Sequence, residues 1–332
     1  MPLNLFKHSW SIKYDVLSVE DLLYASEGVK YPDLIQSLDR VIEVLQRERK
    51  TGRLVRGEIK ESFVELCIPK KLVIIGDIHG DLTSLSCILK GINFETFLGN
   101  PNNKLIFLGD YVDRGVNSIG VLYVVAILKK KYPDSVILMR GNHEAPVEFP
   151  FPSHDLPLQV IRQYGYDKGK LIYNEKILSF FSLLTLATLI EDSLFLVHGG
   201  VPTLDMNLSF KELISSAQKT YLHDTIMEEI LWNDPWQGIK SNQNWEYSRR
   251  GIGKHFGIAI TKRWLKLSNT KVIVRGHEPC QGFKIDHDGS VMTLFSCQEP
   301  YPNFQAAYVF VSDDELLSMQ DAIKLSHLVR KI

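Results

Sequence analysis

Apolar residues in the first part of the chain recur at helical spacing. Between residues 34 and 45 they fall at steps of three and four positions, which predicts one buried face of an amphipathic helix. Ser18 and Asp21 resemble the start of a capping box, and a second helical piece is expected over about residues 57–66. Residues 1–68 are therefore predicted to form a helical cap that carries no chemistry of its own.

Beyond the cap, short β-branched runs alternate with helical patterns. Strands are predicted at residues 71–75, 105–108 and 136–139, with helices over about residues 82–89 and 119–130. The intervals from Asp77 to Asp110 and from Asp110 to Asn142 are 33 and 32 residues, and each matches one βαβ unit. Successive units of this kind form parallel strands whose carboxyl ends share one edge of the sheet, where open α/β sheets carry their sites.

The second half of the chain is typical of strands joined by longer loops. These strands are predicted at residues 183–190, 194–197, 272–274, 291–295 and 307–311. The turn Glu191-Asp192-Ser193 predicts a hairpin between the first two of them. The whole pattern predicts one α/β domain over residues 1–332, with two layers of mixed sheet, helices outside and the cap packed onto it.

Composition and charge describe an ordinary soluble protein. The chain is 45% hydrophobic and 23% charged, enough for a sizeable core. Its 38 basic and 39 acidic residues leave no net charge that would attract nucleic acid or an anionic membrane. No signal peptide opens the sequence, and the longest apolar run, residues 178–190, is too short to span a bilayer. The four scattered cysteines indicate a reducing compartment, so a cytoplasmic location is expected.

Five predicted strand ends each carry an Asp, Asn or His beside a glycine. They are residues 76–80, 109–115, 141–144, 198–200 and 275–278. A single such end is more often a turn or a satisfied polar pair than a ligand. A hydrophobic sheet edge does not gather five of them without something that neutralises them, and the glycines let the backbone approach an ion closely.

The chemistry of these side chains favours metal ions. Carboxylates, imidazoles and one amide without a thiolate suit Mn²⁺, Fe or Zn²⁺ better than Ca²⁺ or a cysteine-rich zinc site. There are about enough ligands for two ions that share a bridge, and two ions about 3.5–4 Å apart are the usual clamp for displacement at phosphorus. Arg114 and Arg250 suit phosphoryl oxygens. His143, oriented by Asp113, is a candidate general acid.

In order and spacing, three of these segments resemble the metal-dependent Ser/Thr phosphoprotein phosphatases. They are Gly-Asp-Ile-His-Gly at 76–80, Gly-Asp-Tyr-Val-Asp-Arg-Gly at 109–115 and Gly-Asn-His-Glu at 141–144. His198-Gly-Gly, Leu-Trp-Asn-Asp-Pro at 231–235 and Arg-Gly-His-Glu at 275–278 extend the resemblance, which covers roughly residues 34–320. It implies the calcineurin-like fold, a four-layer α/β/β/α sandwich. It also implies hydrolysis of phosphoserine and phosphothreonine by attack of a water or hydroxide bound to two metal ions, with phosphoproteins as substrates and regulatory proteins as further partners.

The resemblance also assigns the site residue by residue. One ion would be held by Asp77, His79 and Asp110, and the other by Asp110, Asn142, His198 and His277, with Asp110 as the bridge. The phosphate would contact Arg114, Arg250, Asn142 and Tyr301, and His143 paired with Asp113 would be the acid. Mn²⁺ is the ion expected first, with Fe and Zn²⁺ as alternatives.

Two loops depart from the family pattern. Residues 145–157 hold four prolines and lack the usual continuation, and the loop from Phe295 to Tyr301 has two residues more than usual, followed by Pro302 where many relatives have a cysteine. Loops over a site govern substrate choice. A dinucleoside tetraphosphate hydrolase is an alternative, because such enzymes use the same metal core on a small substrate, although the helical cap and the Leu-Trp-Asn-Asp-Pro and Arg-Gly segments favour a protein phosphatase. An inactive phosphatase fold that serves as a binding scaffold is another, although no ligand is missing. His154, in the first loop, is expected to be a surface or satisfied core residue, like the other histidines outside the motifs.

Overall fold

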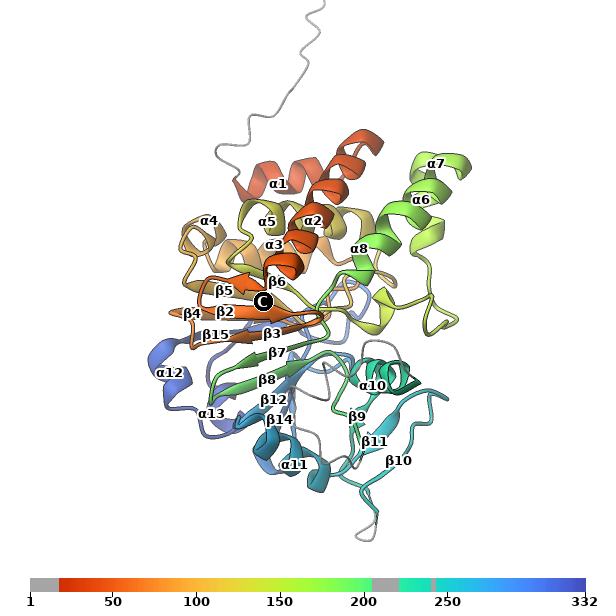
Figure 1. Cartoon of the computed structure of the whole chain (residues 1–332). Helices are drawn as coiled ribbons and strands as arrows, with labels where there is room; N and C mark the ends of the chain where they lie inside the picture. The colour runs from red at the N-terminus through yellow and green to blue at the C-terminus, as the bar shows by residue number, and fades with distance from the viewer. Residues whose placement is uncertain (1–17, 205–220, 240–242) are drawn as a thin grey trace, which may run out of the picture.

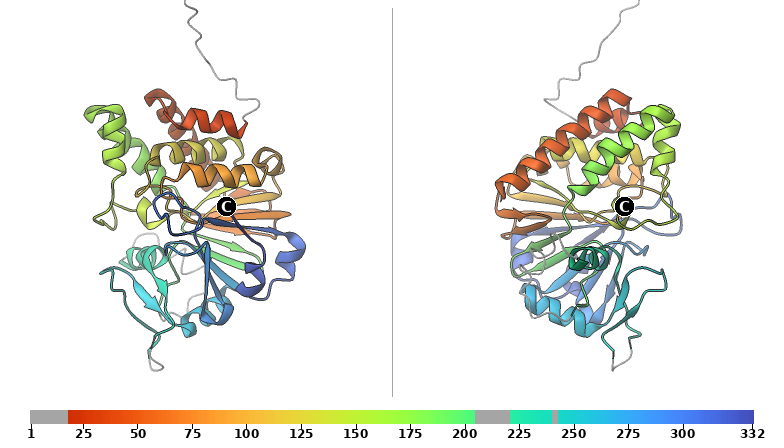
Figure 2. Two further views of the ribbon diagram at one scale, coloured as in Figure 1. Left: turned by 180° about the vertical axis from the view of Figure 1, so that it is seen from behind. Right: turned by 45° about the vertical axis from the view of Figure 1, so that its right-hand side comes forward.

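Two β-sheets stack face to face, and helices cover their outer faces (Figure 1). The computed structural model describes residues 18–204, 221–239 and 243–332. The two views of Figure 2 show the same layers from behind and after a turn of 45° about the vertical axis. The predicted α/β sandwich is therefore confirmed.

The five-stranded sheet contains the predicted βαβ units. Its strand order is β16 (Val329–Lys331), β15 (Ala307–Ser312), β4 (Lys71–Ile75), β5 (Asn103–Phe107) and β6 (Val136–Leu138). Strands β4, β5 and β6 are parallel, and in register Ile75 lies opposite Phe107 and Phe107 opposite Leu138. Their connections contain α3 (Leu82–Gly91), α4 (Phe94–Leu98) and α5 (Ser118–Lys131). The register brings the carboxyl ends of the three strands to one edge.

The eight-stranded sheet supplies the other layer. Its order is β1 (Arg53–Leu54), β2 (Gly57–Lys60), β3 (Phe63–Leu66), β7 (Ala187–Ile190), β8 (Leu194–Val197), β12 (Val272–Arg275), β14 (Val291–Leu294) and β13 (Phe283–Asp286). The predicted hairpin joins β7 and β8, and Asp192 in its turn has φ 56°. Strands β8, β12 and β14 are parallel. A small third sheet has the order β10 (Trp245–Tyr247), β11 (Lys254–Phe256) and β9 (Asp234–Pro235).

The prediction of a helix over residues 57–66 is wrong, because this segment forms strands β2 and β3. Ile59, Phe63 and Leu66 are buried, and their spacing of four and three positions imitates a helical face. Strand β3 pairs in parallel with β7, so the segment extends the sheet. The helical part of the cap is α1 (Val19–Ser26) and α2 (Tyr31–Thr51), and it ends at Gly52, which is left-handed with φ 67°.

Helices α2 and α5 pack against each other over the five-stranded sheet. Leu34, Leu38 and Val41 of α2 belong to the same buried cluster as the apolar residues of α5. Where the two helices meet, the Lys129 ammonium lies 2.6 Å from the Glu48 carboxylate. Lys129 also donates to two backbone carbonyls, so this buried charge is fully paired.

Alternate residues of the central strands face the two sides of each sheet. Leu72 and Ile74 of β4 face the eight-stranded sheet, and Val73 and Ile75 face the helices. Both faces are buried, which explains why such strands are continuous apolar runs in the sequence. On the far side, α10 (Tyr221–Trp232) and α11 (Ile258–Ser268) pack against the eight-stranded sheet.

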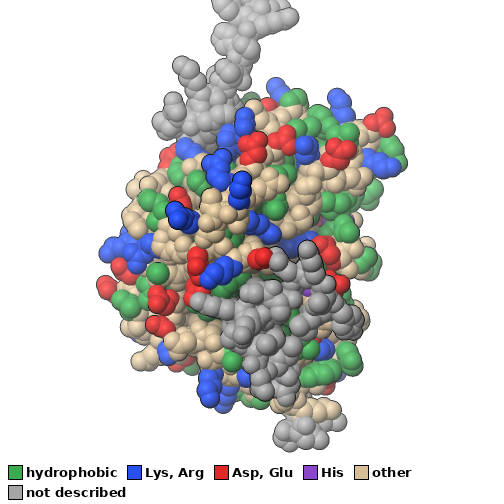
Figure 3. Space-filling model, viewed as in Figure 1, with side chains coloured by type: hydrophobic (Ala, Val, Ile, Leu, Met, Phe, Trp, Pro, Cys, Tyr) green, Lys and Arg blue, Asp and Glu red, His purple; other side chains and the backbone are tan. Residues whose placement is uncertain are grey.

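The remaining helices of the described segments lie around this sandwich. They are η1 (Asn142–Glu144), α6 (Leu156–Tyr164), α7 (Tyr166–Ile172), the π-helical η2 (Tyr173–Ile177), α8 (Leu178–Ser182), η4 (His287–Gly289), α12 (Asp313–Leu317) and α13 (Ala322–Ser326). Among the described residues, no helix combines the length and the apolar character that crossing a bilayer requires. Basic and acidic side chains are interspersed on the face seen in Figure 3.

Candidate active site

The carboxyl ends of strands from both sheets converge on one buried site. Asp77, Asp110 and Asn142 follow β4, β5 and β6, and His198 and His277 follow β8 and β12. The structure brings together all the side chains predicted as metal ligands, and all are buried: Asp77, His79, Asp110, Asn142, His198 and His277. The site therefore lies where the two sheets meet.

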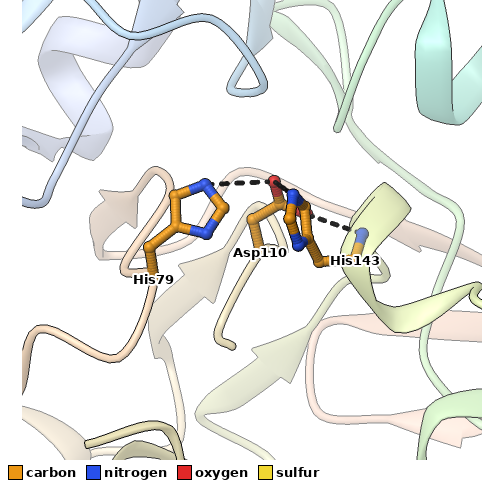
Figure 4. A group of neighbouring side chains, drawn as sticks. All are labelled: His79, Asp110 and His143. Atoms are coloured by element: carbon orange, nitrogen blue, oxygen red, sulfur yellow. Dashed lines mark hydrogen bonds and ion pairs between the residues drawn. The ribbon is translucent and has the colours of Figure 1, made fainter. Parts of the chain in front are cut away.

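Asp110 occupies the centre of this group. Its Oδ2 lies 3.5 Å from His79 Nε2, and its Oδ1 lies 3.3 Å from His198 Nε2. There are two sets in which one ligand atom from each residue lies within 4.8 Å of the others. The first set is His79, Asp110 and His143, and the second is Asp110, His198 and His277. Figure 4 shows the first set, with the side chains of His79 and His143 on either side of the carboxylate. Because Asp110 belongs to both sets, one carboxylate faces two candidate cation positions.

Backbone carbonyls orient two of the imidazoles. His79 Nδ1 lies 2.9 Å from Val112 O, and His198 Nδ1 lies 3.0 Å from Leu108 O. A carbonyl only accepts hydrogen bonds, so each Nδ1 carries the proton and each Nε2 presents its lone pair to the site. Metal-binding histidines are usually held in this way.

Some polar atoms in the site make no hydrogen bond. Among the described residues, Asp77 Oδ2 and His277 Nε2 are buried without a hydrogen bond, although Asp77 Oδ1 accepts one from His277 N at 2.9 Å. The amide oxygen of Asn142 lies 2.9 Å from both His198 Nε2 and His277 Nδ1. A buried carboxylate oxygen without a hydrogen bond is unfavourable, and a divalent cation would satisfy Asp77 Oδ2. The donor set of carboxylate, imidazole and amide atoms fits two such ions.

The electrostatics of the site also favour cations. Burial raises the pKa of Asp77 to about 6. Burial raises the pKa of Asp110 well above its ordinary value, and the neighbouring Asp77 and Glu144 raise it further. Burial also lowers the pKa of His79, His198 and His277 well below the usual range. Neutral imidazoles are the form that binds metals, and cations would restore the charged form of the carboxylates.

The backbone at the site is held in unfavourable conformations. His79, Asp110, Asp113, Arg114 and His277 all have positive φ, between 46° and 71°. Non-glycine residues rarely adopt this region, and it persists only where the surrounding structure enforces it. A Cβ atom at Gly276 would collide with Asp77 Oδ1, so this glycine is needed for close approach to the carboxylate.

Glu144 connects the ends of β5 and β6 through hydrogen bonds, a role that was not predicted from the sequence. Its carboxylate accepts hydrogen bonds from the backbone N–H groups of Asp110, Tyr111 and Gly141 at 2.8–2.9 Å. Burial raises the pKa of Glu144 to about 7. Its place in the motif Gly-Asn-His-Glu was the signal that could have identified it.

Three of the predicted phosphate ligands, Arg114, Tyr301 and Arg250, lie around the candidate metal ligands. Arg114 donates to the Tyr301 hydroxyl, and its Nη2 lies 3.3 Å from His143 Nε2. The Tyr301 ring centre is 6.1 Å from that of His79, so the longer loop still delivers this tyrosine to the site. Arg250 instead pairs with Asp234 at 3.2 Å, and its side chain is 38% exposed.

The predicted acid and its partner are in contact. His143 Nδ1 lies 2.7 Å from Asp113 Oδ2. Burial lowers the pKa of His143, and the Asp113 carboxylate opposes this shift. Burial alone would raise the pKa of Asp113, but hydrogen bonds from His143 and His154 outweigh it and hold the pKa below its ordinary value.

His154 belongs to the same group, although its sequence context predicted only a surface or satisfied core residue. Its Nδ1 lies 2.8 Å from Asp113 Oδ2, the oxygen that also binds His143. The loop of residues 145–157 therefore folds onto the acid pair. The only sign of this arrangement in the sequence is that residues 145–157 depart from the family pattern.

The known proteins that this chain resembles are phosphoesterases and serine/threonine protein phosphatases. Residues 70–281 match the family model described as calcineurin-like phosphoesterase. A putative serine/threonine-protein phosphatase of Schizosaccharomyces pombe is 30% identical over 280 residues, which are 80% of this chain and 84% of that protein. A PP2A-like serine/threonine-protein phosphatase of Saccharomyces cerevisiae is 28% identical over 82% of this chain and 73% of its own length. Serine/threonine-protein phosphatase T of S. pombe is 34% identical over 70% of this chain, which spans 46% of that protein.

Solved structures share the fold. A protein serine/threonine phosphatase from Saccharomyces cerevisiae, similar to human phosphatase PP5, superposes with a TM-score of 0.66 at 24% identity, over 86% of this chain and 83% of that one. A cold-active protein-tyrosine phosphatase of Shewanella superposes with a TM-score of 0.51 at 17% identity, over 76% of this chain and 78% of that one.

Proposed function

The chain belongs to the calcineurin-like phosphoesterase family, among its serine/threonine protein phosphatases, and from this premise we propose how its own residues act. It is a phosphoric monoester hydrolase with phosphoproteins as substrates, and divalent metal ions take part in its reaction. The observation that carries the proposal for the site is the Asp110 carboxylate, which is shared by two sets of buried ligand atoms.

We assign one ion to Asp77, His79 and Asp110, and the other to Asp110, Asn142, His198 and His277. The orphaned Asp77 Oδ2 supports this assignment, and His277 presents its Nδ1 to the ligand group, 2.9 Å from the Asn142 amide oxygen. Mn²⁺ is the ion we propose first, because carboxylate and amide oxygens suit it and no thiolate takes part, and Fe and Zn²⁺ are alternatives that suit the imidazoles. When bound, two such ions act as Lewis acids on phosphoryl oxygens and lower the pKa of water towards neutrality.

The guanidinium of Arg114 would receive the phosphoryl oxygens. It lies between Tyr301 and His143, so an oxygen bound there is held next to the proposed acid. The Asn142 amide N–H and Arg250 would complete the phosphate contacts, with Arg250 leaving Asp234. Guanidinium groups stabilise the charge that develops on these oxygens in the transition state.

His143 would supply the proton that the leaving alkoxide needs. Asp113 binds its Nδ1, so its Nε2 faces the site and carries the acidic proton when the ring is charged. A serine alkoxide is a poor leaving group, and proton transfer to it is worth about 10²–10⁴-fold in rate.

Two substrates with different leaving groups test this role. His143→Asn should lower turnover of a phosphoserine peptide by about 10²–10⁴-fold, and its effect on p-nitrophenyl phosphate should be clearly smaller, because p-nitrophenolate leaves without a proton. Metal content should stay at the wild-type level. Equal losses on both substrates would instead assign His143 to metal binding, since His143 also lies within ligand range of Asp110.

The inactive-scaffold alternative has no support, because every predicted ligand and the acid pair are present in the buried site. The other alternative is a dinucleoside tetraphosphate hydrolase, and comparing turnover of a phosphopeptide with turnover of diadenosine tetraphosphate tests it.

We further propose that residues 1–332 act as a single catalytic unit in the cytoplasm, with regulatory proteins as partners and without nucleic acid or membrane. The four cysteines, all in the described part of the chain, are free thiols, as in a reducing compartment.

A further inference from the structure

The Asp113 carboxylate is bound by two imidazoles and two backbone amides. Its Oδ2 accepts from His143 Nδ1 at 2.7 Å and from His154 Nδ1 at 2.8 Å. Its Oδ1 accepts from the N–H groups of Asp155 and Leu156 at 2.9 Å and 2.8 Å. Two oxygens with two partners each use the full acceptor capacity of a carboxylate. Three of the four donors come from the short segment 154–156.

Tyr173 fixes the proton on His154. Its hydroxyl lies 2.6 Å from His154 Nε2. A tyrosine O–H donates to an imidazole lone pair, so the His154 proton is on Nδ1 and points at Asp113. The hydrogen bonds from Tyr173 and His154 therefore run in one direction, towards Asp113.

Aromatic packing and burial hold this arrangement in place. The Phe151 ring lies edge-on to both imidazoles, with its centre 4.5 Å from that of His143 and 5.5 Å from that of His154. The His154 side chain is only 12% exposed. Tyr173 opens the π-helical η2, and π-helical turns occur frequently at functional sites.

We propose that His154, held by Tyr173, is a positioning residue for the reaction proposed above. It fixes the rotation of the Asp113 carboxylate, and Asp113 in turn aligns His143 for proton transfer. The torsion that rotates a carboxylate is soft, so a carboxylate with one fewer partner on Oδ2 samples more orientations. Loss of His154 then affects the step that needs a proton and leaves substrate binding intact.

Three variants separate this role from simple support of the loop. His154→Leu removes the donor to Asp113. His154→Asn keeps a donor, because the asparagine amide nitrogen occupies nearly the position of imidazole Nδ1. Tyr173→Phe removes only the hydroxyl. His255→Asn is the matched control, since His255 also faces a carboxylate, Glu246, but lies on β11 away from Asp113.

His154→Leu should lower kcat on a phosphoserine peptide by about 10- to 100-fold, the usual effect of losing a group that orients an active-site residue. KM, metal content and turnover of p-nitrophenyl phosphate should change little. His154→Asn should restore most of the loss, Tyr173→Phe should show a smaller loss of the same kind, and the control should match wild type. Equal losses on both substrates, or no rescue by asparagine, would overturn the proposal.

An NMR measurement tests the same contact without turnover. In protein with ¹⁵N-labelled histidine, the His143 Nδ1–H proton should give a slowly exchanging downfield signal. His154→Leu should broaden or shift it, and His154→Asn should preserve it. An unchanged signal in His154→Leu would contradict the positioning role. If the wild type hydrolyses neither phosphopeptide nor p-nitrophenyl phosphate, the proposed function fails, and this signal still decides whether His154 positions Asp113.

Discussion

Asp110 is the residue on which the site's charge and geometry depend most. It lies between His79 and His198, and it keeps φ 56° at the end of β5. Its Oδ1 also accepts from His143 N at 3.1 Å. One side chain thus contacts both candidate cation positions and the segment that carries the proposed acid.

Asp110→Asn should lose metal and activity together while the fold persists. Asparagine has the same shape and tolerates left-handed backbone, but it lacks the negative charge that a bridge between two cations requires. Elemental analysis, phosphopeptide turnover and circular dichroism measure the three properties. Asp192→Asn is the control, because Asp192 has the same φ of 56° in the exposed β7–β8 turn, and it should change none of them. Full metal occupancy in Asp110→Asn would contradict the bridging role.

At the scale of elements, the sequence predicts best where one signal decides the structure. Strand β4 has the predicted bounds, because a continuous apolar run followed by Gly76-Asp77 fits a strand buried on both faces. The strands β2 and β3 were missed because Ile59, Phe63 and Leu66 have helical spacing, and only pairing with β7 makes them a sheet. The position of His154 depends on how a proline-rich loop folds over β5 and β6, and no local pattern records that.

The buried ion pair between α2 and α5 gives a prediction for these helices. Lys129→Met should lower the free energy of unfolding by about 3–5 kcal/mol, because it leaves Glu48 buried and unpaired. Adding Glu48→Leu should recover most of this loss. Denaturant midpoints measure both. Arg40→Met, at the exposed Arg40–Glu43 pair, should change the free energy by no more than about 1 kcal/mol. A double variant no more stable than Lys129→Met would contradict the explanation.

At the scale of the molecule, the site lies between the two sheets, so metal binding and stability are linked. Burial raises the pKa of the Asp77 carboxyl from its ordinary 3.8 to about 6. Between these values the folded protein holds more protons than the unfolded chain. The contribution of Asp77 to the stability of the metal-free protein therefore falls as pH rises, and it is lost once the pH exceeds about 6.

A bound cation keeps the Asp77 carboxylate ionised and removes this loss. The stabilisation by Mn²⁺ should therefore be larger at about pH 7 than at about pH 5. Thermal midpoints of metal-free protein, with and without added Mn²⁺ at both pH values, measure the effect. The Asp110→Asn variant is the control and should show little stabilisation at either pH. If the difference between the thermal midpoints with and without Mn²⁺ does not increase with pH, the linkage is contradicted.

The meeting of two sheets at one site also has a consequence for the order of folding. Asp77 and His277 contact each other although 200 residues separate them in the chain, so their loop must close before the site exists. Contacts of such high sequence separation form slowly. The ligands from β4, β5 and β6 can assemble first as a half-site, and those from β8 and β12 complete it only when the second sheet docks. Binding of the second ion, whose proposed ligands include His198 and His277, would therefore follow that docking.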